Sequence, residues 1–306
     1  MKDLPFFGGV ELGGSKTVCA VGSTSMGILE QVRLATEDPS ATLEAAIQYF
    51  RERSKSQRVE SLGIASFGPL DLNPDSSTFG HIGLTPKGGW SWTELLDLFR
   101  RELGIPVYLQ TDVAAAALAE SRFGAANDVD QFVYLTLGTG IGGAAIVRGR
   151  LLKGPFHPEM GHIPVYRMEG DTFEGSCPFH GSCLEGMASG SSIAARVGRD
   201  AHEVPLDHEV WKYHAGYLAQ GLASYTYVLA PGCIVLGGGI ALGRDGLLPR
   251  LRDELREALA GFQEPGNLEY DYLRSAVLGG DAGIRGALLL AELGAEAGAV
   301  SRPLKS

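Results

Sequence analysis

The residues with the clearest chemistry in this sequence are two cysteines and two histidines close together in the chain. Cys177, His180 and Cys183 are each three residues apart, and His162 precedes them. Two sulfur and two imidazole ligands complete the tetrahedral shell that zinc prefers. A shell of four protein ligands leaves no open position for an activated water, so we expect a structural rather than a catalytic zinc ion.

The same residues allow a second interpretation. Cys177 and Cys183 could form a disulfide, and the two histidines could be ordinary core or surface residues. The chain has only four cysteines, and the other two, Cys19 and Cys233, lie in apolar, strand-like runs. Such usage is typical of a reducing cytoplasm, where paired cysteines more often bind metal. The spacing therefore favours zinc.

Three polar residues flank the predicted zinc loop. Glu159 and His162 come before it, and Glu185 follows it. Carboxylates accept hydrogen bonds and imidazoles donate or accept them, so this set suits the vicinal hydroxyls of a sugar. A bound zinc ion would fix Glu159 and the His162 ring in position for such a ligand. The alternative is that these side chains are simply solvated.

Composition narrows the class of protein. The chain has 306 residues, of which 44% are hydrophobic and 20% charged, an ordinary balance for a soluble globular protein. Its net charge of −10 opposes binding to nucleic acid or to an anionic membrane, so we expect neither partner. The charge does not oppose ATP, because backbone N–H groups and a metal ion can hold phosphates.

The sequence also predicts where the protein works. The N-terminal run MKDLPFFGGVELGG lacks the long apolar core of a signal peptide. No stretch is apolar over the length of a membrane span. Together with the sparse cysteines, these features predict a cytoplasmic protein.

The chain reads as two halves that begin in the same way. Strand-like segments at 5–12 and 15–22 are joined by two glycines, and segments at 131–137 and 141–148 are joined by a second glycine-rich turn. Each half continues with alternating strands and helices. We therefore predict a two-domain α/β protein with a cleft between the domains.

The remaining elements follow from periodicity and turn residues. We predict further strands at 27–34, 60–67, 105–110, 233–236 and 272–278, and helices at 40–53, 91–103, 112–123, 188–199, 207–229, 246–261 and 281–294. The predicted division is a small N-terminal α/β domain, 1–113, and a large C-terminal α/β domain, 114–306, which carries the zinc loop. The last helix, at about 281–294, is expected to pack back on the small domain.

Glycine-rich turns are the candidates for phosphate binding. In the segment from Glu11 to Thr17, two glycines let the backbone approach a phosphate, and Ser15 and Thr17 can donate hydrogen bonds. Lys16 could add positive charge or be solvated, and Glu11 could hold Mg²⁺ through water. The spacing is not that of a Walker loop, and a Gly-Gly hairpin turn taken alone is more often only a turn.

A second copy of this turn runs from Leu137 to Gly143. Two such turns that face one another could clamp a triphosphate from both sides, so the pair is more specific than either member. A third run, Gly237-Gly238-Gly239, follows a strand and precedes a helix. It could leave room for a nucleotide base or ribose, or it could be only a strand–helix turn.

Asp112 is the acidic residue whose position best suits a catalytic base. It lies where a predicted strand ends and a predicted helix begins, which is a common place for an Asp that caps the helix. A free carboxylate there could instead accept the proton of an attacking hydroxyl during phosphoryl transfer. Both roles are possible at one position.

These pieces coincide in one family. The chain resembles the ROK sugar kinases of the actin-like ATPase superfamily, nearly from end to end. The segments that carry the resemblance are GGVELGGSKT (8–17), SFGPLDL (66–72), TPKGGW (85–90), TDVAAAALAE (111–120), LTLGTGIGGA (135–144), HPEMGHIPV (157–165), CPFHGSCLEG (177–186) and VLGGGI (235–240). Within the family the chain is most similar to bacterial fructokinases, because of Glu11, the SFGPLDL and TPKGGW segments, and the Cys-x-x-His-x-x-Cys spacing.

The resemblance implies a fold, an activity and a dimer. The fold is the two-domain actin-like ATPase (ribonuclease H-like) fold with an interdomain cleft. The activity is ATP-dependent phosphorylation of D-fructose at its 6-hydroxyl, with Mg²⁺, through closure that excludes water and aligns the reactants. A two-fold homodimer is expected as well.

The resemblance also assigns residues. Asp112 matches the catalytic base, and His162, Cys177, His180 and Cys183 match the zinc ligands. The sugar-contacting set is Gly68, Pro69, Thr111, Asp112, Glu159, His162 and Glu185. The ATP-contacting set is Gly13, Gly14, Ser15, Lys16 and Thr17 in the first turn, Gly138, Thr139, Gly140 and Gly142 in the second, and Gly238 and Gly239 beside the nucleoside.

Two positions depart from the family. Many relatives have Asn at the positions of Thr111 and Ala114, near the expected sugar site. Each hydrogen bond lost or moved there is worth on the order of 1 kcal/mol, so the hexose could also be mannose, glucose or N-acetylmannosamine. A sugar-sensing regulator is the remaining alternative. Such regulators carry an N-terminal DNA-binding motif, which we do not expect here because the first predicted hairpin begins near residue 5.

Overall fold

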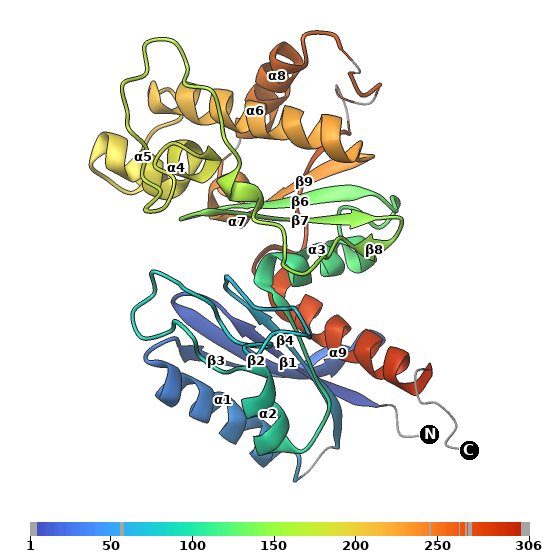
Figure 1. Cartoon of the computed structure of the whole chain (residues 1–306). Coiled ribbons are helices and arrows are strands. Elements are labelled where there is room, and N and C mark those ends of the chain that lie inside the picture. Colours follow the sequence, from blue (N-terminus) through green and yellow to red (C-terminus); the bar gives the residue numbers. More distant parts are fainter. Residues whose placement is uncertain are drawn as a thin grey trace. The chain divides into compact units, whose positions relative to one another are not determined.

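The chain folds into two compact units (Figure 1). The structure is a computed structural model, and it describes residues 5–55, 58–244, 246–262, 264–266, 268 and 271–300. Unit 1 contains the chain up to Ala119, the segment Lys153–His157, and the chain from Gly280 onward. Unit 2 contains Glu120–Leu152 and Pro158–Gly279.

Unit 1 is built on a mixed sheet of five strands. Their order is β3 (Gly27–Ala35), β2 (Lys16–Ser23), β1 (Phe6–Leu12), β4 (Val59–Ser66) and β5 (Val107–Thr111). The first three strands pair antiparallel, and β1, β4 and β5 pair parallel. The helices of this part of the chain are α1 (Pro39–Arg53), α2 (Leu96–Leu103), α3 (Asp112–Phe123), which begins in unit 1, and α9 (Ala282–Val300).

The sheet of unit 1 has two apolar faces, because a strand turns successive side chains to opposite sides. On one face, Val10 packs with Phe50 of α1 and Phe99 of α2. On the other face, Val18 packs with Ile284 of α9. Figure 1 shows α9 on the side of the sheet opposite to α1 and α2. Helices therefore bury both faces.

The last helix completes unit 1 from far along the chain. A methyl group at Gly63 of β4 would lie 1.9 Å from the Ala287 carbonyl oxygen, so only glycine lets α9 pack this closely. The sequence places the end of the small domain after residue 113. The structure continues unit 1 to Ala119 and adds Lys153–His157 and the helix that starts at Ala282.

Unit 2 repeats the sheet of unit 1. Its strand order is β10 (Leu273–Ser275), β9 (Cys233–Gly237), β6 (Phe132–Leu137), β7 (Ile141–Val147) and β8 (Arg150–Leu151). The strands β6, β7 and β8 pair antiparallel, and β6, β9 and β10 pair parallel. The order and pairing therefore match those of unit 1 strand for strand, and the predicted repeat is confirmed.

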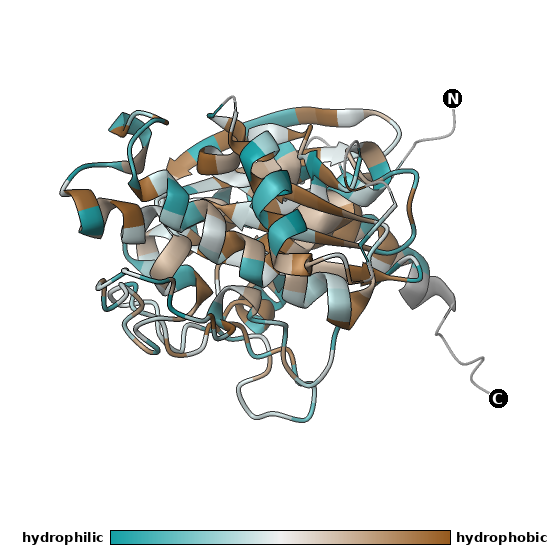
Figure 2. Ribbon diagram, turned by 90° about the horizontal axis from the view of Figure 1, so that it is seen from above, coloured by the Kyte–Doolittle hydropathy of each residue, from teal (hydrophilic) through white to brown (hydrophobic). Residues whose placement is uncertain are grey.

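Helices bury one face of this second sheet. They are α4 (Leu184–Ala188), α5 (Gly190–Val197), α6 (Val210–Leu229), α7 (Gly238–Leu242) and α8 (Leu247–Leu259), with short 3-10 turns η1 (Met160–His162), η2 (Ala201–Glu203) and η3 (Gly279–Asp281). Val133 and Leu135 of β6 share a core with Trp211 of α6 and Leu255 of α8. Figure 2 shows the strands mainly in apolar colours and the helices with apolar and polar residues alternating.

Two helices differ from the prediction. The helix predicted from residue 91 begins at Leu96, because the Trp92 N–H donates to the Ile82 carbonyl and keeps the preceding chain in a loop. The helix predicted at 188–199 is α5, which begins at Gly190 because the Ser189 hydroxyl caps it, and the separate short helix α4 directly before it was not predicted. No helix of the described residues is long and apolar enough to cross a membrane.

A buried ion pair fixes the irregular chain before α4. Arg196 of α5 donates two hydrogen bonds of 2.8 Å to the Asp171 carboxylate, and the Tyr217 hydroxyl of α6 donates a third of 2.6 Å. The Arg196 guanidinium also lies over the Phe173 ring, 4.1 Å from its centroid. These donors hold the pKa of Asp171 well below its usual range, since they stabilise the charged carboxylate.

We expect Asp171→Asn to lower the free energy of unfolding by about 3 kcal/mol at neutral pH, because Arg196 would stay buried without its partner. Because the folded pKa of Asp171 lies below the unfolded value, the wild-type contribution is complete at neutral pH and is lost as the pH falls below about 4. Urea unfolding followed by circular dichroism measures both effects. Asp253→Asn, at a side chain 79% exposed, is the control and should change little.

Candidate functional site

The four predicted metal ligands come together in unit 2. His162 ends η1, Cys183 directly precedes α4, and Cys177 and His180 lie on the tight turn between them. Their ligand atoms all lie within 4.8 Å of one another. Both thiols are free, so the alternative of a disulfide between Cys177 and Cys183 is wrong.

The distances within this cluster suit a single tetrahedral metal ion. The His162 Nδ1 atom lies 3.7 Å from Cys177 Sγ and 3.5 Å from Cys183 Sγ, and His180 Nδ1 lies 3.8 Å from Cys177 Sγ. Zinc–sulfur bonds of about 2.3 Å and zinc–nitrogen bonds of about 2.0 Å, at tetrahedral angles, put ligand atoms about 3.5–3.8 Å apart. Three of the six separations between ligand atoms therefore match such an ion, and all six are within 4.8 Å.

His162 presents its two ring nitrogens to different partners. Nδ1 faces the thiols, whereas Nε2 lies 4.0 Å from Glu159 Oε2 and 4.0 Å from Glu185 Oε1. These last distances are too long for direct hydrogen bonds. A metal on Nδ1 would leave the Nε2–H group as a donor, directed at the space between the two carboxylates. Three of the seven residues predicted to contact a sugar, Glu159, His162 and Glu185, are thus neighbours.

Glu185 connects this cluster to the second glycine turn. Its Oε2 atom accepts the Ile141 N–H at 2.9 Å. A methyl group at Gly140 would lie 2.6 Å from the same oxygen, so glycine makes room for the carboxylate. A methyl group at Gly161 would lie 1.9 Å from the Ile141 carbonyl oxygen. The absence of a side chain at Gly161 therefore lets η1 pack directly against β7. Backbone contact therefore positions His162 and Glu185 beside the turn.

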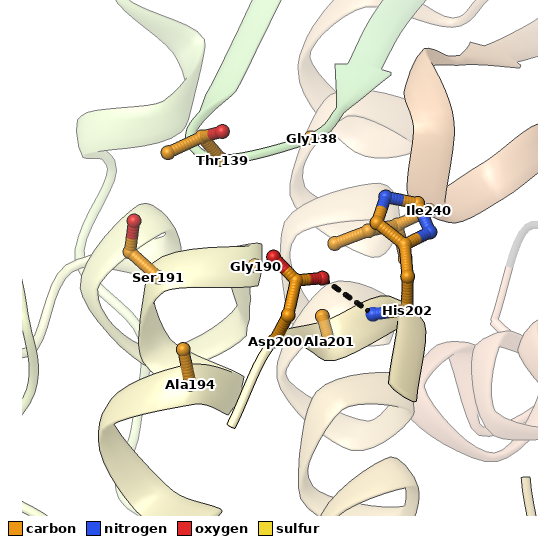
Figure 3. Close-up of a pocket in the computed structure, with 9 residues that line it drawn as sticks. All are labelled: Gly138, Thr139, Gly190, Ser191, Ala194, Asp200, Ala201, His202 and Ile240. Carbon is orange, nitrogen blue, oxygen red and sulfur yellow. Dashed lines mark hydrogen bonds between the residues drawn. The ribbon is translucent and has the colours of Figure 1, made fainter. Parts of the chain in front are cut away.

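The second glycine turn forms one wall of a pocket of about 140 Å³ (Figure 3). The residues that line it are Gly138, Thr139, Gly190, Ser191, Ala194, Asp200, Ala201, His202 and Ile240. The Gly190 N–H donates to the Gly138 carbonyl at 2.8 Å, and the Ser191 N–H donates to the Thr139 carbonyl at 3.0 Å. These bonds hold the start of α5 against the turn.

The opposite wall of this pocket comes from η2 and α7. Asp200 accepts the His202 N–H at 2.8 Å and so fixes the turn that carries both residues (Figure 3). A methyl group at Gly239 would lie 3.2 Å from the His202 ring. Gly238 has a φ of 85°, and a side chain there would meet the Leu137 carbonyl. Gly238 and Gly239 do not line the pocket themselves, but they directly precede Ile240, which does, and Gly239 lies behind the His202 ring.

The first glycine turn lies in unit 1, between β1 and β2. The Gly13 N–H donates to the Lys16 carbonyl at 3.0 Å, and Gly14, Ser15 and Lys16 are exposed. Thr17 differs, because its side chain is fully buried and its hydroxyl forms a 2.8 Å hydrogen bond with Thr36. The tip of this turn, Gly14 to Lys16, is therefore its accessible part.

Glu11 lies beneath this turn, at the N-terminus of α9. A methyl group at Gly283 would lie 2.6 Å from its carboxyl carbon, and the Ile284 N–H bonds to the carboxylate. Burial raises the pKa of Glu11, and the nearby Lys16 opposes this shift. Its Oε2 atom is buried and has no hydrogen-bond partner among the described residues. An oxygen ligand in this state fits a hydrated cation.

Asp112 is the first residue of α3, but it is not the cap of that helix. The Ala114 N–H donates to the hydroxyl of Thr111 at 3.2 Å, which gives Thr111 the capping role. Asp112 Oδ1 accepts the N–H of Val113 at 2.8 Å. Of the two roles that the sequence left open, capping by the side chain therefore belongs to Thr111.

The Gly68-Pro69 segment is held by a residue that the sequence analysis did not single out. The peptide bond between these two residues is cis. The Leu70 N–H donates to His157 Nε2 at 2.9 Å, and a methyl group at Gly68 would lie 3.5 Å from the His157 ring. His157 lies far along the chain, in the Lys153–His157 segment of unit 1, so no local pattern points to this contact.

Sequence reasoning also missed most of the pocket. Ser191, Asp200 and His202 carry polar groups on its walls, yet they come from two separate elements, α5 and the capped turn η2. No spacing pattern links residues that only packing brings together. The N-cap pattern at Asp200 and the glycine run at 237–239 were the signals available, and neither identifies a pocket alone.

Comparison with known proteins identifies the class. The order of both sheets is that of the actin-like ATPase fold, which ROK sugar kinases share. The ROK hexokinase of Thermus thermophilus has a similar structure, with a TM-score of 0.78 and 30% identity, covering 95% of this chain and 99% of that one.

The sequence comparisons give the family. The ROK family pattern matches residues 7–293. A putative fructokinase of Bacillus subtilis is 42% identical over 98% of this chain and 99% of its own length. A fructokinase of Pediococcus pentosaceus is 38% identical over 93% of this chain and 97% of its own length. The chain belongs to the ROK family.

We expect Thr111→Val to lower the free energy of unfolding by about 1 kcal/mol, because valine has the same shape but cannot accept the Ala114 N–H. Asp112→Asn should change stability by less than about half of this, since the amide oxygen can still accept the Val113 N–H. Urea unfolding of both variants tests the assignment. Equal losses, or the larger loss at Asp112, would return the capping role to the aspartate.

Proposed function

We propose that this chain is a fructokinase, which transfers the γ-phosphoryl group of ATP to the 6-hydroxyl of D-fructose. The observation that carries this proposal is the identity of 42% and 38% to fructokinases that match almost their full length. In the reaction, the 6-oxygen bonds to the γ-phosphorus while the bond from that phosphorus to the β–γ bridging oxygen breaks. The products are fructose 6-phosphate and ADP, and one proton is released.

We assign the general base to Asp112. The residue lies at the N-terminus of α3, and Thr111 takes the capping bond there. A carboxylate that is not needed as the cap can accept the proton of the sugar hydroxyl as the phosphoryl group is transferred. Little covalent chemistry is required of the protein beyond this, since phosphoryl transfer depends mainly on positioning and charge stabilisation.

Glu159, His162 and Glu185 are the proposed sugar contacts of unit 2. Two carboxylates that face one imidazole N–H offer acceptors and a donor for adjacent hydroxyls. Gly68 and Pro69, held by His157, and Thr111 are the proposed contacts of unit 1. The preference for fructose over other hexoses rests on the comparison rather than on these contacts, because all ROK hexose substrates carry vicinal hydroxyls.

For ATP, the proposal uses the backbone N–H groups of the two glycine turns. They are Gly13 to Lys16 in unit 1 and Gly138 to Gly142 in unit 2. The pocket beside Gly238 and Gly239 is the proposed nucleoside site. Glu11, with its buried oxygen, is the proposed ligand of hydrated Mg²⁺, which would neutralise phosphate charge when bound.

His162, Cys177, His180 and Cys183 are the proposed zinc ligands. Zinc would supply no catalytic chemistry here, since all four positions would be filled by the protein. The ligands themselves fix the chain on either side of them, and with it the His162 ring and the neighbouring Glu159. A two-fold homodimer stays a prediction from the family resemblance.

The purified protein with ATP and Mg²⁺ should consume ATP fastest with fructose, compared with mannose, glucose and N-acetylmannosamine. Asp112→Asn should lower kcat about 10²- to 10⁴-fold, because the proton loses its acceptor, with little change in sugar affinity. A coupled assay for ADP release measures both. Asp97→Asn, at a side chain 59% exposed on α2, is the matched control.

Faster turnover with another hexose would support the kinase activity but show that fructose is not the preferred substrate. Near-normal turnover by the Asp112→Asn variant would show that Asp112 is not the general base. No turnover with any of the four sugars, in protein that binds sugar, would reject the kinase and favour a sensor.

Zinc should be present at about one ion per chain, as measured by plasma mass spectrometry. We expect His180→Ala to lose most of it and to bind fructose about tenfold or more weakly, because the loop that carries His162 loosens. Phe179→Ala, at the exposed neighbour, should keep both metal and affinity. Metal-free protein with unchanged fructose affinity in calorimetry would show that zinc does not order the sugar contacts.

A further inference from the structure

Lys87 lies between two segments of unit 1 that the proposed function uses. Its ammonium group donates a hydrogen bond to the Gly14 carbonyl, in the first glycine turn. The same group lies 6.0 Å from the centroid of the Phe67 ring, and Phe67 directly precedes the Gly68-Pro69 segment. Lys87 is thus next to the turn assigned to phosphate and next to the loop assigned to sugar.

The loop that carries Lys87 is built to hold it there. Trp90 is fully buried, packs edge-on against Phe67 at 5.3 Å, and donates from its indole N–H to the Glu37 carbonyl at 3.0 Å. The Trp90 N–H donates back to the Lys87 carbonyl at 3.2 Å and closes the turn. An anchored tryptophan therefore fixes the backbone from which the lysine extends.

The charge of Lys87 is not neutralised locally. None of the carboxylates among the described residues forms an ion pair with it, and the side chain is only half-buried. Its ammonium group lies 5.9 Å from the Trp90 ring centroid, so two aromatic faces and one carbonyl surround a full positive charge. An ammonium group has three donors, and Gly14 uses one of them. The others remain for an anion.

We propose that Lys87 contacts the phosphoryl group in transfer, the γ-phosphate of ATP as it moves to the sugar oxygen. This inference rests on the proposed kinase function. Backbone N–H groups provide most of the phosphate contacts, and in a chain of net charge −10 a fixed cation beside them adds charge stabilisation where negative charge develops. Lys87 is a catalytic residue in this assignment, because it touches the reacting group.

Three substitutions separate the charge of Lys87 from a merely structural role. Lys87→Met removes charge and donor, Lys87→Gln keeps a donor for Gly14 without charge, and Lys87→Arg keeps both. We expect kcat to fall about 10²-fold in the Met and Gln variants and to stay within about tenfold of wild type in the Arg variant. The KM for fructose should change little. Lys55→Met, at an exposed lysine after α1, is the control.

Binding measurements decide the contact independently of turnover. With Mg²⁺ present, calorimetry compares ADP with the non-hydrolysable analogue AMP-PNP, which adds the third phosphate. Lys87→Met should weaken AMP-PNP binding about tenfold more than ADP binding, because the lost contact is with the γ-phosphate. Equal weakening of both nucleotides, or normal kcat in the Met and Gln variants, would overturn the proposal and leave Lys87 as a support for the turn.

These outcomes also separate the two proposals. If wild-type protein does not phosphorylate fructose yet Lys87→Met selectively loses AMP-PNP, the fructokinase assignment fails and the phosphate contact stands. If wild-type protein phosphorylates fructose and Lys87→Met behaves normally, only the inference about Lys87 fails.

Discussion

The candidate site of unit 2 depends on how a long irregular segment is fixed. Between His162 and Leu184 the chain forms no helix and no named strand, only turns and isolated bridges. A segment of this length must be ordered by specific contacts, because it lacks the hydrogen-bond ladder of regular structure. Two clusters supply them: the four candidate metal ligands, which bring the two ends of the segment together, and the Asp171–Arg196–Tyr217 network in the middle. Together with the contact of η1 on β7, they fix the chain that carries Glu159 and the His162 ring.

The duplicated sheet explains why similar turns occur at equivalent positions. In each unit, the first two strands form a hairpin, and the first strand also pairs parallel with a later one. The hairpin turns then project beyond the sheet at 13–14 in one copy and 138–140 in the other, where backbone N–H groups are available to an anion. Their surroundings differ. The turn of unit 1 contains the cation Lys16 and accepts a hydrogen bond from Lys87, whereas that of unit 2 is braced by Glu185 and the start of α5.

This chain and the phosphates of ATP are both negatively charged, so the repulsion between them must be offset where the phosphates bind. Net charge acts over long distances and is screened by salt, whereas phosphate contacts act at hydrogen-bond distance. The structure therefore needs only a few cations, if each is fixed where charge develops. Lys87 meets that condition because the buried Trp90 anchors its loop. Glu11, whose pKa is raised by burial, would gain a compensating charge from a hydrated cation.

The sequence by itself determined the features that are formed by residues close together in the chain. The Cys/His cluster was predictable because three of its four residues lie on one tight turn, and the repeat was predictable because each hairpin is a local pattern. The tertiary structure decided the rest: how closely α9, whose return to the small domain the sequence already suggested, packs on the sheet of unit 1, the pairing of His157 with Leu70, the capping of α3 by Thr111 rather than Asp112, and the pocket shared by α5, η2 and α7. The reason is physical. Spacing fixes which side chains one turn can bring together, whereas contacts between distant segments depend on how whole elements pack, as at Gly63, where the absence of a side chain lets a helix from the far end of the chain approach the strand.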